Sequence, residues 1–288
     1  MGPFFVSRSY FILAFLFALE VSLFAQENFP VLTRTITFEK LLRYASTRDL
    51  VWTNPNGVQE KMSITEMSIP IDQKMMQLTL GFVISNYGLN SVWLQPRVIV
   101  FHAMGDGDLK TSLEVSSFLN DQIPESWGNL YKAGLLPNGA HFIIDKDGKI
   151  ICLTPPVSSD GSRISYKKEN HKWIIKRHQD GNPVAIGIEN VTDRGNFTML
   201  TDKQIESNAR LARWLIWMED NKIDYLTSHH QYNDDSNYEF FLKAFNLKHL
   251  QLPYRTRGRR DIGDPNVRKI IEKVNRTGYF IHSFFELK

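Results

Sequence analysis

Short apolar segments that alternate with stretches of helical periodicity constrain the fold of this chain most strongly. They are residues 97–101 (RVIVF), residues 184–191 (VAIGIENV) and residues 224–227 (DYLT). Continuous apolar runs rich in β-branched residues are typical of strands buried on both faces of a sheet. After residue 201, apolar residues recur every three or four positions, which predicts an amphipathic helix between the second and third strands.

Residues 141–153 predict a β-hairpin. Two apolar runs flank the sequence DKDG at residues 145–148, and Asp-Gly between apolar runs is a strong turn signal. A hairpin is antiparallel, whereas strands that alternate with helices favour parallel pairing. We therefore expect an α/β fold with a mixed central β-sheet flanked by helices.

Two helix starts are marked in the sequence. Thr201, followed three residues later by Gln204, has the pattern of a capping box. Asp264 followed by Pro265 has the pattern of a helix cap and first helical residue. A last helix is therefore predicted to begin at Asp264.

Charge and cysteine content exclude several classes of protein and site. The formal net charge is +3, and no basic stretch interleaved with aromatic residues is present, so nucleic-acid binding is not expected. The single cysteine, Cys152, can form neither an internal disulfide nor a Cys-based zinc cluster. It lies in an apolar run, which predicts a buried side chain. Any metal must therefore bind through His, Asp or Glu.

Residues 1–25 have the pattern of an export signal. Arg8 precedes an apolar run at 11–19, and Ala25 is a small residue near the end. The run is shorter than the roughly 20 residues of a membrane span. Because Leu23 stands where a small residue is preferred, an uncleaved anchor is the alternative. We expect an exported protein of the periplasm, cell envelope or exterior, which meets the membrane only through this segment.

The chain divides into three predicted parts. Residues 1–25 are the signal peptide, residues 26–94 are an N-terminal extension of unknown role, and residues 95–288 are the domain that carries the chemistry. The sequence gives no indication of the oligomeric state.

Three polar residues stand at the ends of predicted strands: His102, Glu189 and His229. If the strands are parallel, these side chains meet at one edge of the sheet, where α/β folds bind ligands. Two imidazoles and a carboxylate favour zinc, which in catalytic sites has three protein ligands and an open position. Taken singly, each residue has the alternative of an ordinary hydrogen-bonded or ion-paired side chain.

Four segments, in this order, resemble the type 2 N-acetylmuramoyl-L-alanine amidases, a family similar to phage amidase-type lysozymes and peptidoglycan recognition proteins. They are residues 99–102 (IVFH), 139–150 (GAHFIIDKDGKI), 177–191 (RHQDGNPVAIGIENV) and 226–232 (LTSHHQY). Together they fall between about residues 95 and 275. The resemblance implies a zinc-dependent hydrolase that acts on peptidoglycan or muropeptides.

The resemblance also implies roles for individual residues. His102 and His229 would bind Zn²⁺, and Glu189 would be the catalytic base for the attacking water. Asp264 would be the third zinc ligand, with Asp261 as the alternative. A role of Asp264 as helix cap is the competing interpretation, and one carboxylate can serve both roles.

One position departs from the family pattern. Family members often carry a lysine two residues before the aspartate ligand, where it stabilises the developing oxyanion, but here the residue is Ile262. Arg260 is the candidate replacement, although an arginine does not reproduce a lysine's geometry. His141 and His178 match family histidines with a supporting role. The other histidines are expected to be a neighbour of the site (His230) or surface residues (His171, His249 and His282).

The expected function is therefore hydrolysis of the amide bond between N-acetylmuramic acid and L-alanine in peptidoglycan. The alternative is a non-catalytic peptidoglycan-binding module of the same fold, which the loss of the lysine favours. A third class, a structural envelope protein with incidental histidines, leaves the ordered set of motifs without explanation.

Overall fold

A computed structural model of the chain describes the following residues: 45–67, 80, 83–84, 87–105, 107–109, 140–175, 183–194, 199–228, 243, 246 and 264–283. The predicted signal peptide lies outside them. No helix within these residues is both long and apolar enough to cross a lipid bilayer.

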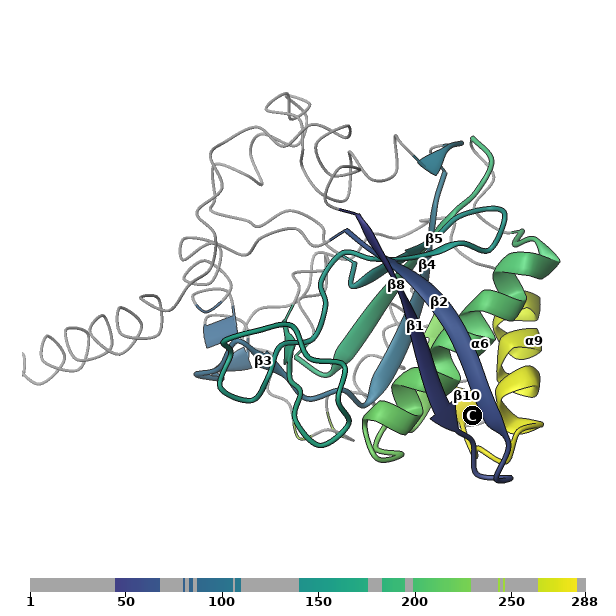
Figure 1. Cartoon of the computed structure of the whole chain (residues 1–288). Coiled ribbons are helices and arrows are strands. Elements are labelled where there is room, and N and C mark those ends of the chain that lie inside the picture. Colours follow the sequence, from purple (N-terminus) through teal and green to yellow (C-terminus); the bar gives the residue numbers. More distant parts are fainter. Residues whose placement is uncertain are drawn as a thin grey trace, which may run out of the picture.

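The described part of the chain is built around one large β-sheet with two helices packed on it (Figure 1). The strand order is β1-β2-β6-β5-β8-β4-β9-β10. Strand bounds are β1 Ser46–Thr53, β2 Gln59–Glu66, β4 Val98–Met104, β5 Phe142–Ile144, β6 Ile150–Cys152, β8 Ala185–Val191, β9 Tyr225–Ser228 and β10 His282–Ser283. Strands β3 (Trp93–Leu94) and β7 (Trp173–Ile174) form a separate two-stranded sheet. The helices are α6 (Asp202–Met218) and α9 (Asp264–Asn275).

The sheet is mixed, as predicted. Strands β5, β8, β4, β9 and β10 run parallel to one another. Strand β6 runs antiparallel to β5 through the predicted hairpin. Strand β2 pairs in parallel with β6, and β1 pairs antiparallel with β2. The hairpin of residues 141–153 and the three predicted strands are thus confirmed.

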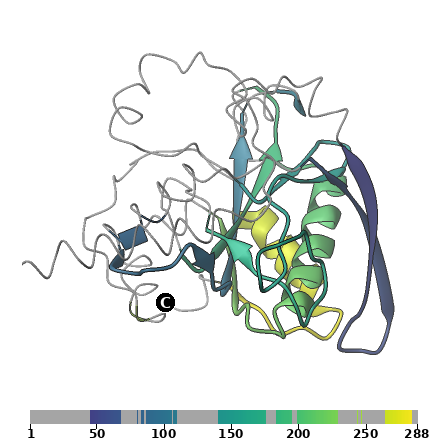
Figure 2. The same cartoon turned by 60° about the vertical axis from the view of Figure 1, so that its left-hand side comes forward.

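One face of the sheet carries the main core and both helices. Side chains alternate between the two faces of a strand, so Ile99 and Phe101 point to one face and His102 to the other. Ile99, Phe101 and their counterparts on β8 and β9 belong to a core cluster that includes residues of α6 and α9. Figure 2 shows the two helices side by side against the strands, with the β1–β2 hairpin along one edge. His102 therefore lies on the face opposite the helices.

Helix α6 begins with the capping box that the sequence predicted. The Thr201 hydroxyl accepts from the Gln204 amide at 3.1 Å, and the Gln204 side-chain oxygen accepts from the Thr201 amide at 3.0 Å. The apolar positions of the helix are buried, among them Ile205, Ala209 and Ile216. This buried stripe, rather than the cap alone, fixes the helix on the sheet.

Residues 46–66, which carried no sequence signal of function, form two strands of the sheet. The turn between them contains Gly57 at φ +77°, a conformation that glycine adopts without strain. Leu50 and Trp52 of β1 are buried in the helix-side core. This hairpin therefore packs as part of the same core as the parallel strands, while the boundary predicted at residue 95 stays a prediction.

The expectation that His171 is a surface residue is wrong. Its side chain is 8% exposed, and its Nε2 lies 2.6 Å from a carboxylate oxygen of Glu219. Its Nδ1 lies 2.9 Å from the carbonyl oxygen of Lys168, and Trp173 donates to the same Glu219 carboxylate at 2.8 Å. Burial disfavours the charged imidazolium, but the hydrogen bond and charge of Glu219, together with the backbone carbonyls, outweigh it and raise the pKa of His171.

Replacing His171 with glutamine is expected to destabilise the protein in a pH-dependent way. A raised folded-state pKa means that the folded protein binds more protons than the unfolded chain. The stabilisation is therefore complete below the unfolded pKa of about 6.5 and is lost as the pH rises through the folded pKa. At pH 5.5 we expect a loss of about 1.5–3 kcal/mol, measured by urea unfolding, which shrinks towards pH 9.

Lys168→Gln is the matched control for this experiment. Lys168 forms an ion pair with Asp220 at 2.9 Å next to the same site, and this pair contains no histidine, the side chain whose reference pKa lies between pH 5.5 and 9. Its small effect on stability should be constant over that range. A His171→Gln effect that is equally constant would contradict the charged pair.

Candidate functional site

His102 and Glu189 lie next to each other on neighbouring strands. Strands β4 and β8 are parallel, and their register pairs His102 with Glu189. Paired residues of parallel strands point to the same face and lie about 4.8 Å apart. His102 is 4% exposed and Glu189 is partly buried. An imidazole and a carboxylate thus stand side by side near the carboxyl ends of two central strands.

Strand β9 lies on the other side of β4. It is parallel to β4, and its last residue, Ser228, pairs with Phe101, the residue before His102. His229 follows Ser228 directly in the sequence but lies outside the described residues. The predicted parallel arrangement of the three strands is confirmed, and it brings His102 and Glu189 together. The place of His229 stays a prediction.

Helix α9 begins at Asp264, as predicted. The backbone of Asp264 is described but its side chain is not. The assignment of Asp264 as a zinc ligand therefore stays a prediction, and so does its role as a helix cap. The helix packs against β9 through the core. The other residues proposed for this region lie outside the described part of the chain: Arg260, Asp261, Ile262, His230 and His178.

Both ring nitrogens of His141 contact the main chain. It is 1% exposed, its Nδ1 accepts from the Gly187 amide at 3.2 Å, and its Nε2 lies 3.1 Å from the carbonyl oxygen of Ile174. A carbonyl only accepts, so Nε2 carries the proton and donates. Both ring nitrogens are therefore engaged, which agrees with a supporting rather than a metal-binding role.

A buried amide network fixes the strand ends from the helix side. Asn190, next to Glu189, donates to the carbonyl oxygen of His102 at 3.2 Å and accepts from Asn208 of α6 at 2.6 Å. Gln204 donates to the carbonyl oxygen of Val191 at 2.8 Å. Asn190 and Asn208 are fully buried, so these hydrogen bonds are shielded from water. This network was not predicted from the sequence, although a polar residue inside a buried strand is a signal that indicates such hydrogen bonds.

Asn190→Asp tests the contact with His102 without a change of side-chain shape. An aspartate still accepts from Asn208 but cannot donate to the His102 carbonyl when ionised. We expect a loss of at least about 1–3 kcal/mol in unfolding free energy, because a buried acceptor loses its donor and a charge is buried. Urea unfolding measures it. In the matched control, Asn170→Asp, the side-chain oxygen of Asn170 accepts from Ser159 at 2.7 Å, and an aspartate keeps that bond. An equal loss in both variants would contradict the role of the network.

A metal ion needs several donor side chains that converge on one point. Within the described residues, no three His, Cys, Asp or Glu side chains gather closely enough to hold an ion. His102 and Glu189 supply an imidazole and a carboxylate on one face, the donor types that zinc prefers. His102 would fit a zinc site in which His229 and Asp264 supply the remaining ligands, with Glu189 beside the ion as the base rather than as a ligand.

A comparison with models of protein families shows to which family this chain belongs. Residues 92–239 match the family model Amidase_2, described as N-acetylmuramoyl-L-alanine amidase, which is slightly more than half of the chain. The chain belongs to this amidase family. The matched segment contains His102, Glu189 and His229, whereas Arg260 and Asp264 lie beyond its end. The central strands of the sheet thus belong to the amidase segment, and the proposed third ligand falls outside it.

Solved structures of amidases are among the similar folds. The endolysin amidase LysCS from Clostridium intestinale URNW shares 23% identity and has a TM-score of 0.30, with 56% of this chain and 94% of that chain covered. The amidase LysC from the same organism shares 24% identity at a TM-score of 0.29, with 56% and 96% covered. A selenomethionine derivative of AmpD shares 17% identity at a TM-score of 0.35, with 62% and 89% covered. No curated protein matches the chain.

Proposed function

We propose that this protein is a zinc-dependent N-acetylmuramoyl-L-alanine amidase. It would hydrolyse the amide bond that joins N-acetylmuramic acid to the L-alanine of the peptide stem in peptidoglycan. The observation that carries the proposal is the register of β4 and β8, which places His102 beside Glu189 on one face. Both residues fall inside the segment that matches the amidase family.

The proposed roles follow from the chemistry of amide hydrolysis. His102, His229 and Asp264 would hold zinc, which when bound polarises the scissile carbonyl and makes water more acidic. Glu189 takes a proton from the attacking water and returns it to the departing amine of L-alanine. The Asn190 side chain, which follows Glu189 on β8, donates to the carbonyl oxygen of His102 and so holds the ends of β8 and β4 together. Arg260 would stabilise the charge that develops on the carbonyl oxygen.

A non-catalytic peptidoglycan-binding module is the second candidate. The residue that favours it is Ile262, which stands where many family members carry a lysine. The pair of His102 and Glu189 favours the enzyme, because a module that only binds does not need a base beside a metal ligand. In either case the predicted export signal of residues 1–25 would bring the protein to the compartment that holds its substrate.

Release of peptide from purified peptidoglycan distinguishes the two candidates. The full chain is incubated with insoluble peptidoglycan and zinc, and newly exposed amino termini of L-alanine are counted. The enzyme releases stem peptides, and a chelator stops the release until zinc is restored. Binding to peptidoglycan without any release would contradict the amidase and support the binding module.

A further inference from the structure

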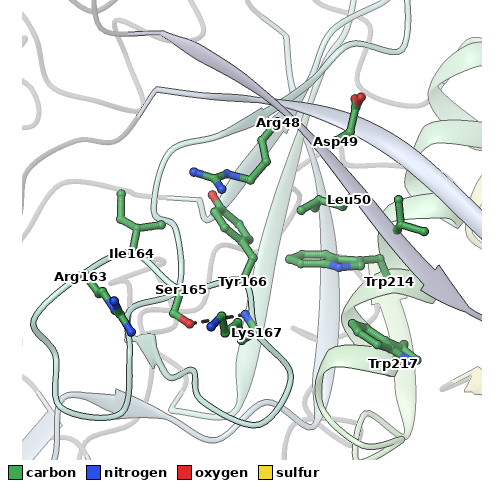
Figure 3. Close-up of a pocket in the computed structure, with 11 residues that line it drawn as sticks. Arg48, Asp49, Leu50, Arg163, Ile164, Ser165, Tyr166, Lys167, Trp214 and Trp217 are labelled. Atoms are coloured by element: carbon green, nitrogen blue, oxygen red, sulfur yellow. Dashed lines mark hydrogen bonds between the residues drawn. The ribbon is translucent and has the colours of Figure 1, made fainter.

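A pocket lies away from the candidate site, between β1, the loop of residues 163–167 and α6 (Figure 3). Its volume is about 400 Å³, within the usual range of small-ligand sites. Its chemistry comes from three cations and three aromatic rings: Arg48, Arg163, Lys167, Tyr166, Trp214 and Trp217. We call it the β1–α6 pocket.

The β1–α6 pocket and the candidate site lie on different faces of the sheet. Leu50 and Trp214, which line the pocket, belong to the core cluster on the helix side. His102 and Glu189 point to the opposite face. A molecule in the pocket therefore cannot touch the proposed catalytic residues directly.

The rim of the pocket is positively charged. Arg163 and Lys167 are exposed, and neither forms an ion pair with any described residue. Arg48 has a long contact with Glu66, 3.7 Å, and its side chain is still 49% exposed. The one acidic lining residue, Asp49, accepts a hydrogen bond from Ser63 at 2.5 Å. Arg163 and Lys167 thus have no ion-pair partner among the described residues, although the Asp160 carboxylate lies near Arg163. The carboxylates around the pocket already accept hydrogen bonds from other side chains: Asp49 from Ser63, Glu66 from Tyr166 and Asp160 from Ser162.

The floor of the pocket is aromatic and held in place. The Tyr166 ring lies 6.0 Å from the Trp214 ring, and the guanidinium of Arg48 lies 5.0 Å from the centre of the Tyr166 ring. The Tyr166 hydroxyl donates to Glu66 at 3.1 Å, which fixes the orientation of the ring. Trp217 is partly buried at one side. A fixed aromatic floor below cations suits a ligand that has both an apolar body and an anionic group.

We infer that the β1–α6 pocket is a second binding site for the wall polymer, which it holds through the carboxylates of peptide stems. The identity of the polymer rests on the proposed function. The cations of the pocket are observed in the structure and do not depend on that proposal. Intact peptidoglycan carries many peptide stems. A glycan strand that is bound in the pocket by one stem therefore presents other stems to the face of the sheet that carries His102. Such a second contact raises retention on the polymer by increasing the local concentration of cleavable stems.

The test removes two cations and measures retention on insoluble wall. The variant is Arg163→Gln with Lys167→Gln, and the control is Lys61→Gln with Lys269→Gln, which removes the same charge from exposed positions on β2 and α9. The wall is first stripped of phosphodiester polymers with hydrofluoric acid. We expect the pocket variant to bind the stripped wall at least about tenfold more weakly, and the control to bind like the unchanged protein.

A soluble muropeptide with one stem separates the two sites. The pocket variant should hydrolyse it at the rate of the unchanged protein, because this substrate needs only the His102 face. If no variant hydrolyses anything but the loss of retention persists, the amidase proposal fails and the second site stands. Equal binding of both variants to stripped wall would overturn the second site. A difference seen only on unstripped wall would also overturn it, because the ligand would then be a phosphate.

Discussion

Replacing Glu189 with glutamine is expected to lower peptidoglycan hydrolysis about 100- to 10,000-fold, the range of a positioned general base. Glutamine has nearly the same shape as glutamate but does not accept a proton from water. Since Glu189 is not one of the proposed ligands, zinc binding and the unfolding midpoint should change little. Initial rates of L-alanine amino-terminus release, with zinc content measured on the same samples, check both parts.

Asp193→Asn provides the matched control for Glu189→Gln. Asp193 follows β8 on the same segment, has a side chain that is 75% exposed, and contacts Lys146 rather than the candidate site. Its neutralisation changes the net charge equally and should leave the hydrolysis rate within a factor of about two, because an exposed ion pair contributes little. A Glu189→Gln variant as active as this control would show that another group serves as the base.

Replacing His102 with alanine is expected to weaken zinc binding by more than about 100-fold, because loss of an outer partner alone costs 10- to 100-fold. Hydrolysis should fall with it. The imidazole is also buried, with 4% of its surface exposed, so some loss of stability is expected from the space it leaves. Zinc affinity is therefore measured by chelator competition at a temperature where the variant is folded.

His141→Gln separates loss of a ligand from loss of a buried histidine. His141 is as buried as His102, but both of its ring nitrogens contact the main chain. Its replacement should lower the unfolding free energy by roughly 1–3 kcal/mol and leave zinc affinity unchanged. If both variants lose zinc equally, disturbance of the fold rather than loss of a ligand would explain the effect.

Elements with a strong local signal were predicted correctly. The Asp-Gly turn with its flanking apolar runs forms the β5–β6 hairpin, and the Thr201–Gln204 pattern forms both bonds of a capping box. The apolar runs before His102 and around Glu189 are neighbouring parallel strands. In each case the determining contacts lie within a few residues, so the sequence displays them directly.

Contacts between distant segments could not be predicted in this way. The parallel pairing of β2 with β6 joins residues 64–66 to residues 150–152, and no local pattern of either strand specifies its partner. The burial of His171 depends on Glu219, nearly fifty residues later in the chain. For the candidate site, the pattern of parallel strands predicted only that polar residues at the strand ends lie close together. The roles of His229, Asp264 and Arg260 came from the family resemblance and not from the spacing of residues.

Zinc analysis of the purified full chain, beside its His229→Ala variant, tests the central claim most directly. The account predicts a single zinc ion per chain in the unchanged protein and almost none in the variant. His229 follows β9 directly, so this result would show that the ion depends on the side chain at the end of that strand, as the account requires. A protein that binds no zinc, or a variant that keeps its full zinc content, would contradict it.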